Sequence, residues 1–285
     1  MNNNKKTIIL CLILFVAALG ITIYPLIANA IAEKYRSEIQ TQYFEAVEVM
    51  DKSEIDEALD DAAKYNRLLT SGVVQNNYSE EALDLANIGY EALLNLNGDG
   101  IMGYIEIPKL DIYLPVSHGT EAETLENCVG HVIGSSLPVG GEGTHAVLSG
   151  HSGMSDQKMF SDLDKLQEGD IFYLHVFDET IAYKVSRTDT VLPEDTSLLG
   201  IEPDKDMVTL VTCTPFGVNT HRLLVRGERT DYVEAAEEVA MIAETADTSS
   251  TWTEEYWKGI AVGIAVLVVI IIVFAYFDSK GVRHD

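Results

Sequence analysis

The sequence has little positive charge and few cysteines. Its 285 residues include 19 Lys and Arg against 45 Asp and Glu, which gives a net charge of −26. So acidic a chain lacks the overall basic surface that nucleic-acid binding requires. Its three cysteines are too few for the disulfide framework of a small secreted domain. Because 47% of the residues are apolar and only 22% are charged, the chain is not disordered throughout, and we expect a conventional core.

Two long uncharged stretches lie near the ends of the chain. Residues 7–32 and residues 259–277 contain no charged side chain, and each stretch is close to the roughly 20 residues that cross a bilayer as a helix. We expect an N-terminal membrane anchor within residues 1–32 and a C-terminal transmembrane helix at residues 257–277. The alternative for the first stretch is a cleaved signal peptide, because Ala28-Asn29-Ala30 resembles a cleavage site of small residues.

Basic residues at the two ends predict the orientation in the membrane. Lys5 and Lys6 precede the first stretch, and Lys280 and Arg283 follow the second. Cytoplasmic flanks carry an excess of Lys and Arg, so both termini are predicted to be cytoplasmic, with a tail at residues 278–285. The middle of the chain is then external. Since most of the acids lie there, it would favour basic segments of a protein partner.

The external region changes character along its length. Residues 33–99 have helix-like apolar spacing, which predicts helices with a loop near residues 70–79 and a possible lid. Asn97-Gly98-Asp99-Gly100 predicts a turn rather than a calcium loop, because no spaced carboxylates follow it. Residues 231–256 contain many acids and no base, and we expect an acidic, partly helical stalk.

Residues 100–230 have the pattern of a mainly β domain. Runs of β-branched and aromatic residues alternate with Gly, Pro and Asp clusters, as is typical of strands joined by turns. Many short strands in a segment of this length favour a closed barrel or a sandwich. The predicted strands are Gly103–Pro108, Thr144–Leu148, Ile171–Val176, Thr180–Val185, Met207–Thr212 and His221–Arg226.

Cys213, His151 and Arg222 are the candidate catalytic residues. Cys213 ends an apolar strand and His151 follows another, so both are expected at the rim of the fold. An imidazole beside a thiol is the minimal arrangement for a cysteine nucleophile. Arg222 lies nine residues after Cys213, and a turn at Pro215–Asn219 would return it to the sulfur. There its guanidinium could hold a substrate carbonyl as negative charge develops.

Each candidate also has an ordinary structural interpretation. Cys213 could be a small buried apolar residue, Arg222 could be a surface arginine paired with Glu228, and Arg226 competes for its role. The other internal histidines are expected in core or surface roles, and their scattered spacing argues against a zinc site. We therefore expect no metal and no cofactor. These histidines are His118, His131, His145, His175 and His221.

The segment Thr209–Gly227 resembles the active-site segment of the class C, pilin-assembling sortases. The resemblance covers about residues 78–230, and the arrangement of two flanking membrane stretches is similar as well. It implies a closed eight-stranded β-barrel in which Cys213 is the nucleophile, His151 the general acid or base, and Arg222 the group that binds the substrate carbonyl. Further matching segments are Gly103–Pro108, Gly134–Gly141, Gly143–His151 and Phe160–Leu166.

The resemblance also implies a reaction. Members of this family cut a Leu-Pro-x-Thr-Gly-like sorting signal between Thr and Gly on the outer face of the membrane of Gram-positive bacteria. They hold the protein as a thioester and pass it to an amine, which in class C is typically a Lys side chain of a pilin subunit. The implied partners are pilins or surface proteins that carry such signals. Alternatives are attachment of proteins to peptidoglycan, hydrolysis of the thioester, and a non-catalytic membrane-anchored β-domain that binds pilins.

One segment departs from the family pattern. Class C members usually carry an Asp-Pro-aromatic lid, whereas the best match here is Asn76-Asn77-Tyr78. Asn76 cannot form the charged pair with Arg222 that an Asp would form, so we expect a looser lid; the alternative is an ordinary linker.

Three further residues in the barrel sequence have expected roles. Thr212 and Thr214 flank the nucleophile and are candidates to orient substrate; the alternative is a plain strand and turn role for each. Cys128 is expected to be reduced and buried, because it lies outside the matched motifs. Cys11 is expected in lipid.

Overall fold

The structure is a computed structural model, which describes residues 2–70, 89–154, 157–233, 235–236, 257–265, 269 and 272. The chain divides into two compact units, residues 1–25 with 249–285 and residues 26–248. The predicted lid at Asn76, Asn77 and Tyr78 lies outside the described residues, as do most of the predicted stalk and much of the C-terminal span. The second unit contains all of the strands.

The described helices and strands run from an N-terminal helical region into a sheet. The helices are α1 (Asn2–Val49), α2 (Lys52–Thr70) and α4 (Ala122–Asn127), with 3-10 turns η1 (Tyr90–Ala92), η2 (Pro108–Leu110) and η3 (Leu163–Lys165). The strands are β1 (Ile101–Ile107), β2 (Ile112–His118), β3 (Val129–His131), β4 (Thr144–Ser149), β5 (Ile171–Val176), β6 (Glu179–Val191), β7 (Asp206–Thr214) and β8 (His221–Arg229).

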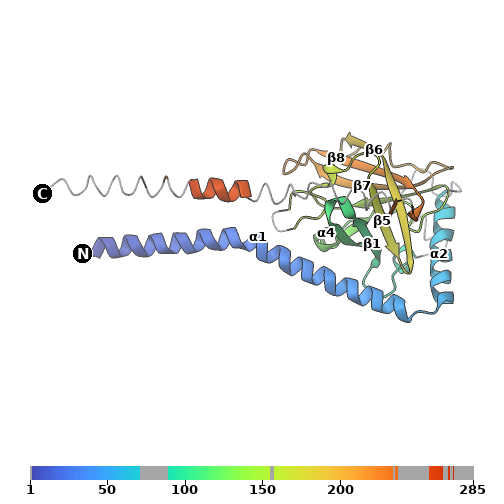
Figure 1. Cartoon of the computed structure of the whole chain (residues 1–285), viewed down its shortest axis with the longest axis horizontal. Coiled ribbons are helices and arrows are strands. Elements are labelled where there is room, and N and C mark those ends of the chain that lie inside the picture. The colour runs from blue at the N-terminus through green and yellow to red at the C-terminus, as the bar shows by residue number, and fades with distance from the viewer. Residues whose placement is uncertain are drawn as a thin grey trace. The chain divides into compact units, whose positions relative to one another are not determined.

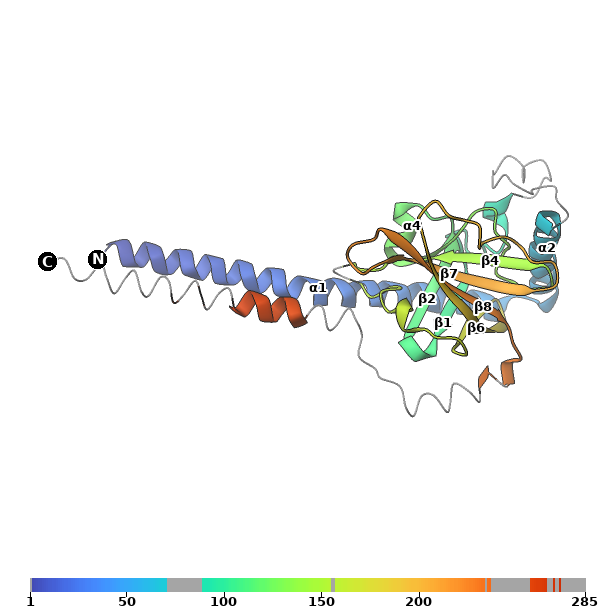
Figure 2. The ribbon, with the colours of Figure 1, turned by 90° about the horizontal axis from the view of Figure 1, so that it is seen from above.

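The eight strands close into a barrel in the order β1-β2-β3-β4-β7-β8-β6-β5. The pairs β2–β3 and β4–β7 are parallel, and the other pairs are antiparallel. Figure 2 shows β4, β7 and β8 side by side across the barrel wall. This architecture confirms the predicted closed eight-stranded barrel, and each of the six predicted strands is present.

Alternation along the strands fills the barrel with apolar side chains. In β7, Val208 and Leu210 belong to the same buried cluster as Ala146 and Leu148 of β4 and Val225 of β8. Successive side chains of a strand point to opposite faces. Thr209, Val211 and Cys213 therefore lie on the outer face of β7, and this parity decides where reactive groups emerge.

The C-terminal part of α1 and the whole of α2 pack on the barrel (Figure 1). The buried hydroxyl of Tyr43 on α1 accepts the amide of Phe177 at 2.9 Å and donates to the carbonyl of Met102 at 3.3 Å. From α2, the buried Asn66 side chain bonds both the amide and the carbonyl of Leu137, at 2.7 and 3.1 Å. These bonds satisfy backbone groups of the barrel, so the helices belong to the same folded unit.

The N-terminal part of α1 is the one described helix that is long and apolar enough to cross a membrane. Its apolar stretch is not buried within the protein. Pro25 lies inside the helix without ending it, as membrane helices tolerate. At the other end of the chain, residues 257–265 are helical. The second span therefore stays a prediction.

Several elements differ from the sequence-based predictions. The strands β2 and β3 were not predicted, because β2 contains Pro115, which weakens a strand signal, and β3 is only three residues long. The helical region breaks at Met50–Asp51, which the apolar spacing did not indicate. The expected turn at residues 97–100 is confirmed, since Gly98 and Gly100 both have positive φ.

His131 is a fully buried histidine that joins β3 to η1. Its Nε2 donates to the carbonyl of Ser136 at 2.8 Å, and its Nδ1 accepts the hydroxyl of Tyr90 at 2.8 Å, which is the pattern of a neutral ring. Burial lowers the pKa of His131 from 6.5 to about 4, more strongly than the bond to the Ser136 carbonyl raises it. The predicted core role of this histidine is confirmed.

This burial predicts a pH-dependent loss of stability. Between pH 6.5 and 4 the unfolded chain binds a proton at His131 that the folded chain does not, so the free energy of unfolding falls as the pH falls. The contribution is on the order of 3 kcal/mol. The free energy of unfolding of the parent chain and of His131→Gln can be measured with denaturant at several pH values. It should depend less on pH in the variant, which has no histidine at this position. Titration of His131 in the folded protein near pH 6.5, followed by NMR, would contradict the prediction.

Candidate active site

Cys213 and Arg222 face each other across the last two strands. The antiparallel register of β7 and β8 pairs Cys213 with Arg222. The connecting turn is closed by the amides of Val218 and Asn219, which both donate to the carbonyl of Pro215 at 3.0 Å. Asn219 has a φ of 62°, a left-handed conformation that Asn adopts more readily than most residues. The turn predicted at residues 215–219 is thus confirmed, and it returns Arg222 to Cys213.

His151 lies on the other side of Cys213. The parallel register of β4 and β7 ends at the pair Ser149 and Val211. Continuing it by two residues places His151 opposite Cys213.

Hydrogen bonds beyond the end of β4 support this continuation. The Gly150 amide donates to the Val211 carbonyl at 3.0 Å, the Thr212 hydroxyl donates to the Gly150 carbonyl at 2.7 Å, and the Ser152 hydroxyl donates to the Cys213 carbonyl at 2.7 Å. The backbone on both sides of His151 is therefore tied to β7.

These registers place the three residues in one row on the outer face of the barrel, with His151 placed by continuing the β4 register beyond its last pair. Neighbouring strands lie about 4.8 Å apart, and directly paired residues share a face. Cys213 has the outward parity of β7, so Arg222 and His151 flank it on that same face. The Cys213 side chain is partly exposed, so a reagent or substrate can reach it. An imidazole near a thiol, with a guanidinium close by, is an arrangement that can support cysteine acyl transfer.

Among the described residues, the contacts of the Arg222 guanidinium are to backbone carbonyls. Its Nη1 donates to the carbonyls of His221 at 3.0 Å and Asn219 at 3.4 Å. Glu228, the acid considered as its partner, instead accepts from Lys205 at 2.9 Å. This geometry leaves a cation beside the sulfur.

Arg226, the competing arginine, has a different position. The register pairs it with Thr209, four residues along β7 from Cys213. Its Nη1 contacts Glu202 at 2.9 Å and its Nη2 bonds the carbonyl of Leu198, so the loop before β7 covers it. The structure favours Arg222 because only that residue lies opposite the thiol.

The other histidines that the sequence singled out are engaged elsewhere. His145 is buried and bonds the Thr209 hydroxyl at 2.7 Å and the Gly200 carbonyl at 2.8 Å, and burial lowers its pKa. His175 contacts Glu106 at 2.8 Å, and His118 bonds backbone carbonyls. His221 bonds the neighbouring Thr220 hydroxyl. Within the described part of the chain, no group of three or more His, Cys, Asp and Glu side chains is arranged to hold a metal ion.

Thr212 and Thr214 differ in their surroundings. Thr212 is buried and its hydroxyl binds the Gly150 carbonyl, so it fixes the end of β4 next to His151. Thr214 is partly exposed and precedes a cis peptide bond to Pro215. Substrate orientation by either threonine stays a prediction. Sequence reasoning missed Ser152, although it directly follows His151, because its bond to the Cys213 carbonyl depends on pairing between distant strands.

The second described cysteine has the opposite environment to Cys213. Cys128 is free and buried, as expected. Burial raises its pKa to about 11, although the nearby Arg36 lowers it. At pH 8 such a thiol is ionised in roughly one molecule in a thousand, and it is the thiolate that reacts. The two cysteines should therefore differ strongly in reactivity.

Alkylation of the full-length chain in detergent tests this difference. We expect iodoacetamide at pH 8 to modify Cys213 while Cys128 stays unmodified until the protein is unfolded, because burial excludes the reagent and keeps the thiol protonated. Peptide mapping by mass spectrometry scores each cysteine, including Cys11, separately. Cys213→Ala is the matched control. Equal modification rates for Cys128 and Cys213 in the folded chain would contradict the prediction.

Comparison with known proteins places this site in a family. The Sortase domain matches residues 105–230, which include the whole row. The crystal structure of sortase C1 from Streptococcus agalactiae is 45% identical, with 67% of this chain and 97% of that chain covered and a TM-score of 0.62. Sortase C from Streptococcus pneumoniae is 40% identical, with 68% and 97% covered and a TM-score of 0.59.

A curated relative matches over part of the chain. Sortase D of Bacillus subtilis is 34% identical over 130 residues, which is 45% of this chain and 63% of that protein. The closed barrel, the outward row of His151, Cys213 and Arg222, and the identity to solved sortase C structures agree with one another. The chain belongs to the sortase family of cysteine transpeptidases, and its solved structural neighbours include sortases C.

Proposed function

We propose that this chain is a membrane-anchored transpeptidase that polymerises pilins. It cleaves a Leu-Pro-x-Thr-Gly-like sorting signal between Thr and Gly, holds the Thr carbonyl as a thioester on Cys213, and transfers it to a Lys amine of a pilin subunit. The observation that carries the proposal is the outward row in which Cys213 lies between His151 and Arg222.

The row assigns one role to each residue in the first half of the reaction. The sulfur of Cys213 attacks the Thr carbonyl, and His151 holds the proton that the thiol releases. Arg222 lies on the opposite side of the sulfur and stabilises the oxygen as it gains negative charge. When the C–N bond breaks, His151 gives its proton to the leaving Gly amine, so the enzyme remains as the thioester.

The second half reverses these transfers. A neutral Lys amine attacks the thioester carbonyl, His151 takes a proton from the amine, and the Cys213 sulfur leaves. The new bond is an amide between Thr and Lys. A thioester retains enough energy for this step without a nucleotide, so the three residues need no cofactor for bond formation.

The pilin substrate and the membrane topology are parts of the same proposal. The solved structure of Streptococcus pneumoniae sortase C is described as informative on pilin substrate specificity, and that protein is 40% identical to this chain. The apolar part of α1 supplies one anchor, and the uncharged residues 259–277 supply a second. With basic residues at both ends, the termini are cytoplasmic and the barrel is external. The acidic external region favours a basic acceptor.

A thioester can be detected directly by mass. We expect the full-length chain in detergent to gain the mass of the acyl fragment when it is incubated with a Leu-Pro-x-Thr-Gly peptide. Cys213→Ala should show no gain while it keeps its folded circular dichroism spectrum, because the side chain lost is small. A pilin fragment with a reactive Lys should then discharge the adduct and gain that mass.

The acceptor distinguishes the possible reactions. Discharge by water alone would indicate hydrolysis, and discharge by a peptidoglycan stem peptide but not by the pilin fragment would indicate wall attachment. The absence of any adduct across a panel of sorting signals would refute the transpeptidase proposal and favour a non-catalytic binding domain.

The two arginines provide a matched test of the cation. Arg222→Lys keeps the charge but loses the planar fork beside the sulfur, and we expect kcat to fall on the order of a hundredfold. Arg226→Lys can keep its ion pair with Glu202, and its turnover should stay within about twofold of the parent. Peptide cleavage assays of both variants measure this. Near-normal turnover of Arg222→Lys would refute the assigned role.

A further inference from the structure

We propose that Arg36 of α1 is a positioning residue for His151, a role that rests on the proposed function of that histidine. Arg36 bonds Gln157, a residue of the loop that follows His151. It acts on the histidine loop, which we define as residues 151–160 and which the structure describes except at residues 155–156.

The histidine loop leaves the barrel at His151, and its last residue, Phe160, lies next to His151 again. The amide of Phe160 donates to the carbonyl of His151 at 2.9 Å, so the two ends of the loop meet. Phe160 is fully buried, and its ring fills the space where Gly150 has no side chain; a Cβ there would lie 2.6 Å from the ring. The position of His151 is therefore coupled to the position of the whole loop.

The near end of the loop is tied to the nucleophile strand. The Ser152 hydroxyl donates to the Cys213 carbonyl, and the Gly153 amide donates to the Ser161 hydroxyl at 3.1 Å. Gly153 also passes close to Gly217 in the turn between β7 and β8, where an added Cβ would lie 3.1 Å from the Gly217 nitrogen. The loop therefore contacts both the strand that carries Cys213 and the turn that follows it.

The far end of the loop is held by Arg36. Its Nη1 donates to Oε1 of Gln157 at 2.6 Å, and the amide nitrogen of that same Gln157 donates to the carbonyl of Glu126 at 2.8 Å. The exposed fractions of Arg36 and Gln157 are only 9% and 7%. A charge-assisted bond with both partners buried is short and directional, so it fixes the loop between α1 and the end of α4.

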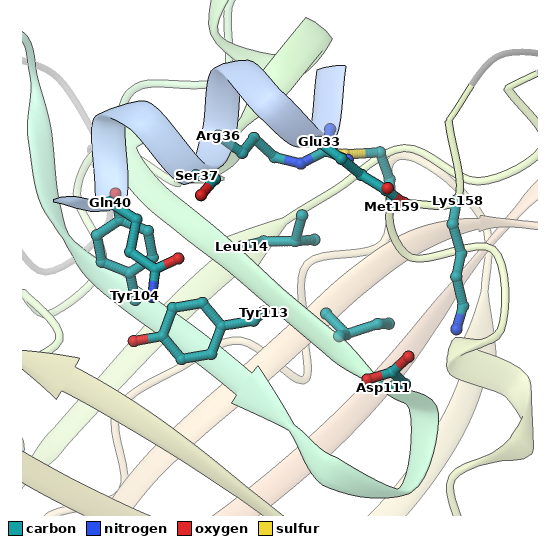
Figure 3. Close-up of a pocket in the computed structure, with 11 residues that line it drawn as sticks. Glu33, Arg36, Ser37, Gln40, Tyr104, Asp111, Tyr113, Leu114, Lys158 and Met159 are labelled. Carbon is teal, nitrogen blue, oxygen red and sulfur yellow. The ribbon is translucent and has the colours of Figure 1, made fainter. Parts of the chain in front are cut away.

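The surroundings of Arg36 show that it is built into the fold. Figure 3 shows Arg36 reaching from α1 toward Met159 of the histidine loop, along one side of a pocket of about 210 Å³. Burial lowers the pKa of the Arg36 guanidinium, and the neighbouring Glu33 raises it. Burying a cation against a neutral amide costs free energy that a surface arginine would not lose. The structure keeps this cation at the point where α1 meets the loop.

The consequence is a connection between the anchor helix and the base. Arg36 lies in α1, whose earlier residues form the apolar stretch. Arg36 holds Gln157, and the loop that carries Gln157 begins at His151. Removing the guanidinium should allow the loop and its histidine to shift, and a displacement of about 1 Å at a reacting group can reduce a rate by up to about a hundredfold.

A double-mutant cycle on the full-length chain in detergent tests the positioning role. We expect Arg36→Met and Gln157→Met each to lower kcat, counted per reactive Cys213, by roughly tenfold or more, with KM within about twofold of the parent. The double variant should lose no more than the larger single loss, because both variants remove the same bond. Arg36→Lys, which can still donate, should recover part of the loss. Lys34→Met on the exposed side of α1 is the matched control and should leave kcat unchanged.

Hydrogen–deuterium exchange gives a readout that needs no turnover. Exchange in residues 151–163 should be faster in Arg36→Met than in Lys34→Met, whereas exchange in β5 and β6 should be the same. Unchanged kcat in Arg36→Met, or losses in the two single variants that multiply in the double variant, would overturn the proposal. A parent chain that forms no thioester would refute the proposed function, and unchanged exchange in the loop would refute the contact itself.

Discussion

The parallel pairing of β4 with β7 is the constraint on which the site depends. It joins segments that are 62 residues apart in the sequence, such as Thr144 with Asp206 and Ser149 with Val211. A shift of this register by one residue would turn the facing side chains to the opposite side of the sheet. The bonds from Thr212 to Gly150 and from Ser152 to Cys213 extend the pairing past the end of β4. His151 and the thiol are therefore set by one ladder.

The two halves of the row have different physical origins. Cys213 and Arg222 are joined by a short hairpin, which local turn chemistry at Pro215 and Asn219 specifies. The placement of His151 next to Cys213 depends on barrel closure, because β4 reaches β7 only when the non-local strands have paired. The apolar side chains inside the barrel, such as Leu148 and Leu210, hold this arrangement while the opposite faces remain available for chemistry.

The helices outside the barrel contribute bonds to backbone groups that the sheet leaves unpaired. The Tyr43 hydroxyl bonds the Phe177 amide and the Met102 carbonyl, and the Asn66 side chain bonds the amide and carbonyl of Leu137. A buried backbone group without a partner costs free energy of folding. These contacts therefore mean that α1 and α2 stabilise the barrel. The C-terminal part of α1 thereby contacts the barrel.

The sequence by itself determined the class of fold and the chemical groups. Alternating apolar runs indicated six of the eight strands, and the positions of Cys213, His151 and Arg222 at strand ends indicated a reactive rim. These signals are local, so they can be read from neighbouring residues. Strand β2 was not predicted, because a proline such as Pro115 argues against a strand in the sequence.

Only the tertiary structure decided which of these groups meet. It placed Arg222 rather than Arg226 opposite the thiol, made His131 a neutral core residue, and brought Arg36 to Gln157 across 121 residues of sequence. The physical reason is that register and closure depend on the summed packing of many distant side chains, which no local pattern contains.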